Sequence, residues 1–370
     1  MSDALVPETR VLAVASHVAY GHVGNTMAGF VMQSLGCEVA ALNTVNFSNH
    51  TGYRQFKGTR ATAQEITDLY EGLCQSNLTD FDVMLSGYAP SAAAVEAVGA
   101  IGIDLQKKAE AKPGSFFWVL DPVMGDQARL YVNDDVVPAY KKIIHHADLI
   151  LPNQFEAEVL SGIQITSLAT LADAITAIHR IYSVPHVIIT SVQLSGFAAS
   201  GSSPNSPDKF LTIIGSTTRS DGSPRLFQVD VPALDCFFSG TGDMFAALTV
   251  ARLREAVVAA GGDLLQTRSW VSPDDVPANE LPLAQSTIKV LSSMHSVLER
   301  TMEARDIELA KEVPALNGAT SPEEQQKREH LRRTKAAEVR LVRNTRLLRE
   351  PLTLFEVQTL RKEDITTDKQ

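Results

Sequence analysis

The chain has 370 residues, of which 44% are hydrophobic, so it can bury a large core as one large or two ordinary domains. Its formal net charge of -10 argues against a nucleic-acid or anionic-membrane partner, because such contacts are built from clustered Lys and Arg. Three widely spaced cysteines suit a reducing compartment, and we find neither a signal sequence nor an apolar run of roughly 18 residues. We therefore expect a globular, cytoplasmic protein, with the nucleus left open as a second compartment.

The first half of the chain alternates apolar runs with helix signals. Strands are predicted over residues 10–16, 38–45, 81–85, 116–120, 149–151 and 187–190. Helices are predicted over residues 27–35, 62–76, 91–112, 134–145, 153–161 and 168–182, the second of them opened by a Thr62-x-x-Glu65 capping box. Apolar strands that alternate with helices are typical of a single large α/β domain, whose mostly parallel central sheet carries helices on both faces.

The second half of the chain changes character. Between residues 196 and 231, Gly, Ser and Pro interrupt short β-rich runs, which predicts hairpins at one edge of the sheet. Helices are expected over 241–260 and 283–311, and the polar stretch 263–282 between them is interpreted as a surface loop. We expect a kinase-sized core over 1–316, a charged helical insertion over 317–339 that is solvated and peripheral to the chemistry, and a segment 340–370 that partly returns to the core.

The strongest functional signal is a glycine turn at the start of the predicted helix 241–260. Gly240 and Gly242 permit a tight turn and the close approach of a ligand, and the first N–H groups of the helix are left without partners. These N–H groups and the positive end of the helix dipole favour an anion. Asp243 beside a bound phosphate is suited to accept a proton, although an Asp that merely caps the helix remains an open alternative for this motif alone.

Other polar residues follow the ends of predicted strands. In a parallel sheet these ends meet at one edge, where ligands bind. The residues are Ser16, Asp121, Asn153, Glu156, Thr190 and Ser191. Carboxylate oxygens suit Mg²⁺, so the sequence supplies an anion site, a cation site and a base, which are the parts that phosphoryl transfer needs. A P-loop, zinc-ligand spacing of histidines and a G-x-S-x-G turn around Ser16 are all missing, which argues against the corresponding enzyme classes.

Six blocks occur in a fixed order along the chain: S-H-V at 16–18, Y-G-H-V-G-N at 20–25, N-F-S-N-H-T-G-Y at 46–53, D-P-V-M-G-D at 121–126, P-N-Q-F-E at 152–156 and G-T-G-D at 240–243. Together they resemble pyridoxal kinase, a family of the ribokinase-like group, over most of residues 10–300 and more weakly over 341–360. The resemblance implies phosphorylation of the 5′-hydroxyl of pyridoxal, pyridoxine and pyridoxamine by ATP. It also implies Mg²⁺ or another divalent cation, often K⁺ as a monovalent one, and a homodimer.

The same resemblance implies roles for single residues. Ser16 and Thr51 would hold the pyridine ring, Tyr88 would line its pocket, and Asp243 would be both base and substrate contact. Asp121 and Glu156 would serve the metal. The residues implied for ATP are Asn153, Thr190, Ser191, Leu234, Gly240, Thr241 and Gly242.

The chain departs from the family in a few places. Leu151 stands where animal members have Thr, which removes one oxygen from the monovalent-cation site, and the flap over residues 126–130 is short. Two alternatives are kept. A hydroxymethylpyrimidine kinase of the same fold resembles this chain but carries Cys where Asp243 stands, and a non-catalytic vitamer-binding protein would not need Asp243, Asn153 and Glu156 intact.

Overall fold

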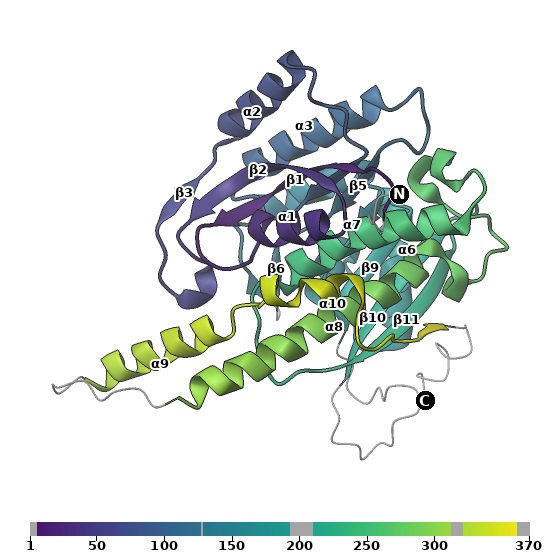
Figure 1. Cartoon of the computed structure of the whole chain (residues 1–370). Helices are drawn as coiled ribbons and strands as arrows, with labels where there is room; N and C mark the ends of the chain where they lie inside the picture. The colour runs from purple at the N-terminus through teal and green to yellow at the C-terminus, as the bar shows by residue number, and fades with distance from the viewer. Residues whose placement is uncertain (1–5, 127–128, 193–209, 312–320, 361–370) are drawn as a thin grey trace.

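The computed structural model describes residues 6–126, 129–192, 210–311 and 321–360. Within these ranges its centre is a ten-stranded sheet in the order β12-β11-β10-β9-β8-β5-β4-β1-β2-β3 (Figure 1). The strands of this sheet are β1 (Arg10–Val18), β2 (Glu38–Phe47), β3 (Gly58–Arg60), β4 (Val83–Ser86), β5 (Phe117–Leu120), β8 (Leu149–Ile150), β9 (His186–Val192), β10 (Phe210–Thr218), β11 (Pro224–Pro232) and β12 (Val357–Thr359). The prediction of one α/β domain around a central sheet is confirmed.

Strand directions also follow the prediction. The neighbours from β2 through β1, β4, β5 and β8 to β9 are parallel. The outer strands β3, β10, β11 and β12 are antiparallel to their neighbours. The predicted edge hairpin is the pair β10–β11, although residues 196–209 of the predicted region lie outside the described residues. Because the central strands are parallel, their carboxyl ends lie at one edge of the sheet.

Helices cover both faces of the sheet (Figure 1). They are α1 (Asn25–Ser34), α2 (Ala63–Gln75), α3 (Ala92–Lys108), α4 (Val136–Ile143), α5 (Gln154–Ser161), α6 (Leu168–Tyr182), α7 (Thr241–Ala260), α8 (Pro282–Leu309), α9 (Pro322–Ala336) and α10 (Thr345–Arg349). One buried cluster joins α1, α7, α8 and α10 to the sheet, and the other joins α2 through α6 to it. The helices of these two clusters therefore bury apolar side chains against a strand layer that is apolar on both sides, whereas α9 buries only Ala336 among its described residues.

Local chemistry sets several helix ends as predicted. At the start of α2 the Thr62 hydroxyl accepts the N–H of Glu65, while the Glu65 carboxylate accepts the N–H of Thr62 at 2.7 Å. α5 ends at Gly162, which has φ 73, a left-handed conformation that glycine adopts without strain. α3 ends at Lys108, four residues before the predicted end.

The expectation of a surface loop over 263–282 is wrong for its central part. Trp270 is 3% exposed and stacks on Phe117 of β5 with ring centroids 4.1 Å apart. Its indole N–H donates to the carbonyl of Gly114 at 2.9 Å, and the buried Ser269 hydroxyl donates to Asp148 at 2.5 Å. The stretch is polar in composition, yet its few apolar side chains cover the sheet near the amino end of β5.

The charged C-terminal region also differs from the expectation. Residues 321–328 at the start of α9 are exposed, as a solvated helix requires, but Ala336, Glu338 and Val339 are buried. Residues 317–320 lie outside the described residues. Leu341 and Leu348 join the core, whereas Leu352 and Leu354 are 59% and 65% exposed.

Among the described helices, none combines the length and apolar character that crossing a membrane requires.

Candidate active site

The parallel strands bring most of the predicted site residues to one edge of the sheet. Ser16 lies near the end of β1, Asp121 follows β5, Asn153 follows β8, and Thr190 and Ser191 lie in the last part of β9. These strands are neighbours or near neighbours in the sheet. The candidate site therefore lies along the edge formed by the carboxyl ends of these strands.

The glycine turn forms the N-terminus of α7. Gly240 is its N-cap residue, with φ 81, and within the described residues no side chain caps this helix end. A Cβ at Gly240 would overlap the carbonyl oxygen of His22, so the loop after β1 packs directly against the turn. The first N–H groups of a 20-residue helix are thus left for a ligand, and with the helix dipole they favour an anion.

Asp243 is the third residue of α7, so it does not occupy the N-cap position. Its carboxylate lies close to the backbone N–H of Gly24, in the loop after β1, and this N–H lowers the pKa of the carboxyl group. A Cβ at Gly24 would overlap the carbonyl and hydroxyl oxygens of Ser16, so Gly24 lets these two segments touch. Ser16 and Asp243 therefore lie on either side of Gly24. Removal from water raises the pKa of Asp243 to about 6.

Two further carboxylates complete an acidic cluster. The carboxylate of Asp121 lies 3.8 Å from the position that a Cβ on Gly242 would take. Burial raises the pKa of Asp121 well above its ordinary value, and the charges of Glu156 and Asp243 raise it further. Burial also raises the pKa of Glu156 to about 7. Neighbouring carboxylates repel one another when they are ionised, and a bound divalent cation would remove this repulsion.

The described residues hold no group of three or more His, Cys, Asp or Glu side chains arranged to bind a metal by themselves. This agrees with Mg²⁺, which usually takes one or two carboxylates and completes its shell with water and phosphate oxygens. Asp121 and Glu156 therefore fit a cation that arrives with a phosphate ligand.

Glu156 and Asn153 have structural contacts that the sequence interpretation did not anticipate. Each caps the other across the start of α5: the Glu156 N–H donates to the Asn153 side chain at 2.9 Å, and the Asn153 N–H donates to the Glu156 carboxylate at 3.0 Å. Glu156 also accepts the N–H groups of Met124 at 2.8 Å and Gly125 at 3.2 Å. The Asn153 amide donates to the Gly125 carbonyl at 2.7 Å. Both side chains therefore fix the turn that follows Asp121.

The residues predicted on the nucleotide side are only partly buried. Thr190 and Ser191 are half-buried, and the Thr190 N–H donates to the carbonyl of Pro152 at 3.0 Å, which holds β9 beside the start of α5. Leu234 packs against the core, while Phe237 nearby is 78% exposed. This stretch leads directly into the glycine turn, so it offers apolar surface next to the anion site.

The loop after β2 carries Thr51, which is exposed and opens a short 3-10 helix, η1 (Thr51–Tyr53). A Cβ at Gly52 would lie 3.2 Å from the Ser239 hydroxyl, so this loop reaches the residue before the glycine turn. Tyr88 packs against a small apolar cluster that includes Val23, and its carbonyl accepts the Thr44 hydroxyl at 2.7 Å. The residues predicted to bind the acceptor thus surround the start of α7.

One residue at this site was missed. Glu338, from the segment interpreted as peripheral, is 8% exposed, and its carboxylate accepts the Tyr53 hydroxyl at 2.8 Å and His50 Nε2–H at 3.1 Å. The expectation that the whole segment 317–339 lies away from the site is therefore wrong. No local pattern could reveal this contact, because His50 and Glu338 are 288 residues apart in sequence. The single sequence signal is the apolar character of Ala336, Val339 and Leu341 around it.

Comparison with known proteins gives a consistent picture. A family model described as phosphomethylpyrimidine kinase matches residues 96–258. The chain is 35% identical to pyridoxal kinase of Ovis aries and 34% identical to that of Homo sapiens, in both cases over 80% of this chain and 86% of the relative. It also resembles the solved structure of pyridoxal kinase from Leishmania donovani in complex with ADP and pyridoxamine. There the TM-score is 0.73 and the identity 28%, over 96% of this chain and 100% of that one.

Proposed function

The chain belongs to the pyridoxal kinase family, and from this premise we propose which of its residues transfer the phosphoryl group of ATP to pyridoxal. The observation that carries the proposal is the position of Asp243. Its carboxylate lies in the first turn of α7, beside the uncapped N–H groups of the glycine turn and close to the N–H of Gly24 in the opposite loop. A carboxylate suited to accept a proton therefore lies next to a group of N–H donors suited to bind an anion.

In the proposed reaction Asp243 accepts the proton of the 5′-hydroxyl group of pyridoxal. The hydroxyl oxygen forms a bond to the γ-phosphorus of ATP, and the bond from that phosphorus to the β–γ bridging oxygen breaks, which releases ADP. The N–H groups at Gly240, Thr241 and Gly242 stabilise the negative charge on the transferred group. A carboxyl pKa of about 6 suits this role, since the group is mostly ionised near pH 7 and still accepts a proton readily.

We assign the divalent cation to Asp121 and Glu156, because the charges of both Glu156 and Asp243 act on Asp121 and raise its pKa. When bound, Mg²⁺ would neutralise phosphate charge. Asn153, Thr190, Ser191 and Leu234 bind the nucleotide on this proposal. Leu151 is buried where animal members carry Thr, so we expect replacement of K⁺ by Na⁺ to change the rate little.

Ser16, Thr51 and Tyr88 are proposed to hold the pyridine ring. Two of their elements, the end of β1 and η1, approach the start of α7, and Tyr88 packs against the cluster that includes Val23. The Leishmania relative was solved with pyridoxamine, which supports including pyridoxamine and pyridoxine with pyridoxal among the substrates.

We further propose that the protein is a homodimer, which light scattering of the purified protein tests. We also propose that it lies in the cytoplasm, with the nucleus as a second compartment, which a fluorescent fusion tests.

The family model favours one other acceptor, a hydroxymethylpyrimidine. That match spans residues 96–258, so it includes Asp243 but not Ser16, Thr51 or Tyr88. The deciding experiment is an ATP-dependent phosphate-transfer assay with pyridoxal and hydroxymethylpyrimidine in parallel. We expect kcat/KM to favour pyridoxal by at least about a hundredfold, because a pocket built for one polar acceptor leaves its groups unpaired with another. Preference for the pyrimidine would reject the proposal.

A further inference from the structure

Glu338 ties together two loops that are distant in sequence. Its carboxylate accepts the Tyr53 hydroxyl at 2.8 Å and His50 Nε2–H at 3.1 Å, both in the loop after β2. It also lies close to the backbone N–H of His22, in the loop after β1, and against Gly21, where a Cβ would be 2.5 Å from a Glu338 oxygen. One buried side chain from the end of the chain therefore contacts both loops at once.

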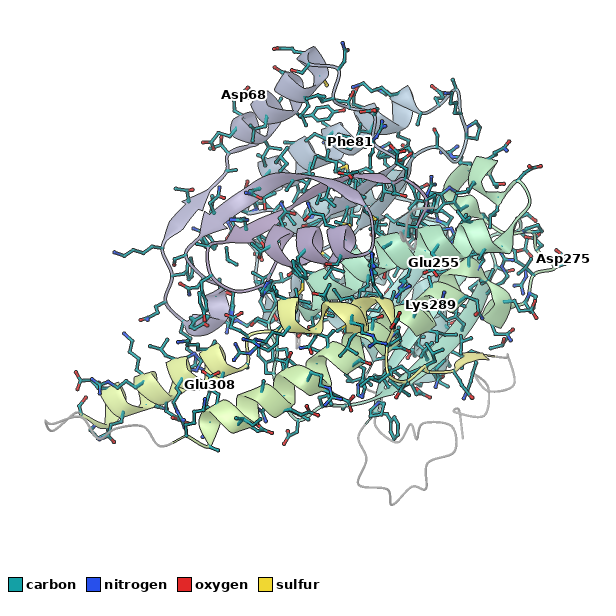
Figure 2. All side chains as sticks on the ribbon, in the orientation of Figure 1. Asp68, Phe81, Glu255, Asp275, Lys289 and Glu308 are labelled. Atoms are coloured by element: carbon teal, nitrogen blue, oxygen red, sulfur yellow. The ribbon has the colours of Figure 1, made fainter. Side chains whose placement is uncertain are left out.

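The backbone around Glu338 is itself fixed to the body of the protein. Val339 and Leu341 are buried in the core, and the N–H of Arg340 donates to the Thr301 hydroxyl of α8 at 3.0 Å. The Arg340 guanidinium pairs with Glu308 at 2.6 Å; Glu308 is labelled in Figure 2 near the end of α8 that faces α9. In Figure 1, α9 runs beside α8. Glu338 is thus held by a rigid support.

A second contact from α9 reinforces the first. His330 Nε2–H donates to the carbonyl of Gly52 at 2.9 Å, within the same short helix that carries Thr51. Gly52 in turn lies next to Ser239 of the glycine turn. The chain of contacts therefore runs from the C-terminal segment through η1 to the start of α7.

Both loops belong to the candidate site. The loop after β1 brings the Gly24 N–H close to the carboxylate of Asp243 and packs His22 against Gly240. The loop after β2 supplies Thr51. We propose that Glu338 is a positioning residue, which holds these two loops closed around the acceptor substrate; this rests on the proposed function, in which the loops bind pyridoxal. It touches neither reactant, and it acts through Tyr53, His50 and His22.

The electrostatics of Glu338 explain why the closed arrangement is favoured. Burial raises its pKa, but hydrogen bonds from His50 and Tyr53 lower it more, so the pKa stays below its usual value. The carboxylate is therefore ionised at neutral pH. If the loops opened while the carboxylate stayed buried, the charge would lose its donors, which is costly.

The test compares Glu338→Ala with Glu329→Ala in the full-length protein. Glu329 is a matched control, because it lies on α9 and pairs only with Arg332 and Arg333 in the described residues, not with either loop. In Glu338→Ala we expect the KM for pyridoxal to rise about tenfold and the KM for ATP to change less than about twofold. Hydrogen exchange of the amides in 48–56, measured without ligand, should be faster than in Glu329→Ala.

Two additional variants provide further tests of the proposal. Glu338→Gln retains an oxygen where Tyr53 and His50 both donate, so its KM for pyridoxal should be close to the wild-type value. Tyr53→Phe removes one hydroxyl only; it should raise the same KM less, and it serves if Glu338→Ala does not fold. Unchanged loop exchange and pyridoxal KM would overturn the proposal. An equal rise in both KM values together with a lower unfolding temperature would also overturn it, since that result describes a general structural role.

The experiment separates this proposal from the proposed function. Wild-type turnover of pyridoxal tests the function alone. Loop exchange in the ligand-free variants tests the contact of Glu338 with the loops, whatever the acceptor is.

Discussion

The backbone N–H of Gly24, in the loop after β1, lies close enough to the carboxylate of Asp243, in the first turn of α7, to lower the pKa of that carboxylate. Gly24 also touches Ser16, because a Cβ at Gly24 would overlap the Ser16 oxygens. Burial has the larger effect and raises the pKa of Asp243 to about 6. The proposed base and Ser16 thus meet at one glycine that is far from Asp243 in sequence.

Replacing Asp243 with Asn tests the base directly. Asn keeps the size of the side chain and an oxygen that can accept the Gly24 N–H, but it does not accept a proton at neutral pH. We expect kcat to fall by about two or more decades, while equilibrium binding of pyridoxal and ATP changes much less. Asp173→Asn, at an exposed position on α6, is the control. Near wild-type turnover of Asp243→Asn would assign the proton to another group.

The pH dependence of kcat should report the same carboxyl group. Its pKa is about 6, and only the ionised form accepts a proton, so kcat is expected to fall as the pH decreases through about 6. Below this value the decrease should approach tenfold for each pH unit. A profile of kcat from about pH 5 to pH 8 checks this. A flat acidic side would contradict it.

Gly24→Ala should damage the site, because the new Cβ would overlap the Ser16 oxygens and because φ 54 at this position strains an L side chain. We expect a loss of about 1–3 kcal/mol in the free energy of unfolding and a reduced kcat. Gly29→Ala is the matched control: it lies on α1, the helix that Gly24 precedes, and its Cβ would meet no atom within 4 Å. That control should leave activity unchanged and slightly raise stability. Equal effects of the two substitutions would refute the close contact.

Metal dependence should run through Asp121 and Glu156. Asp121→Asn and Glu156→Gln are both expected to raise the Mg²⁺ concentration that gives half-maximal rate. Glu156→Gln should in addition lower the unfolding temperature, since the Glu156 carboxylate accepts three backbone N–H groups and a Gln offers one oxygen for them. A Mg²⁺ titration at fixed ATP, with thermal unfolding alongside, measures both effects. An unchanged titration for either variant removes that residue from the metal site.

Sequence pattern was sufficient for most of the central strands and helices and for the edge of the sheet that carries the candidate site. The α6 and α7 boundaries agree with the predicted ranges, and the Thr62 capping box forms as expected. These features are local: the hydrophobic period, the caps and the glycine turn are each determined by residues a few positions apart. The strand order was not predicted, although the rule that parallel strands end at one edge already placed Ser16, Asp121 and Asn153 together.

Only the tertiary structure decided what these residues contact. The metal role of Glu156 stays a prediction, and the fold shows that its carboxylate accepts the N–H of Met124, 32 residues earlier in the chain. Trp270 lies in a polar stretch but fills space over Phe117. Glu338 sits in a charged run that resembles a solvated helix, yet it is buried between two loops of the site. Such contacts depend on which surfaces the folded chain brings together. The sequence around a charged residue does not show whether that residue will accept a hydrogen bond from a distant donor.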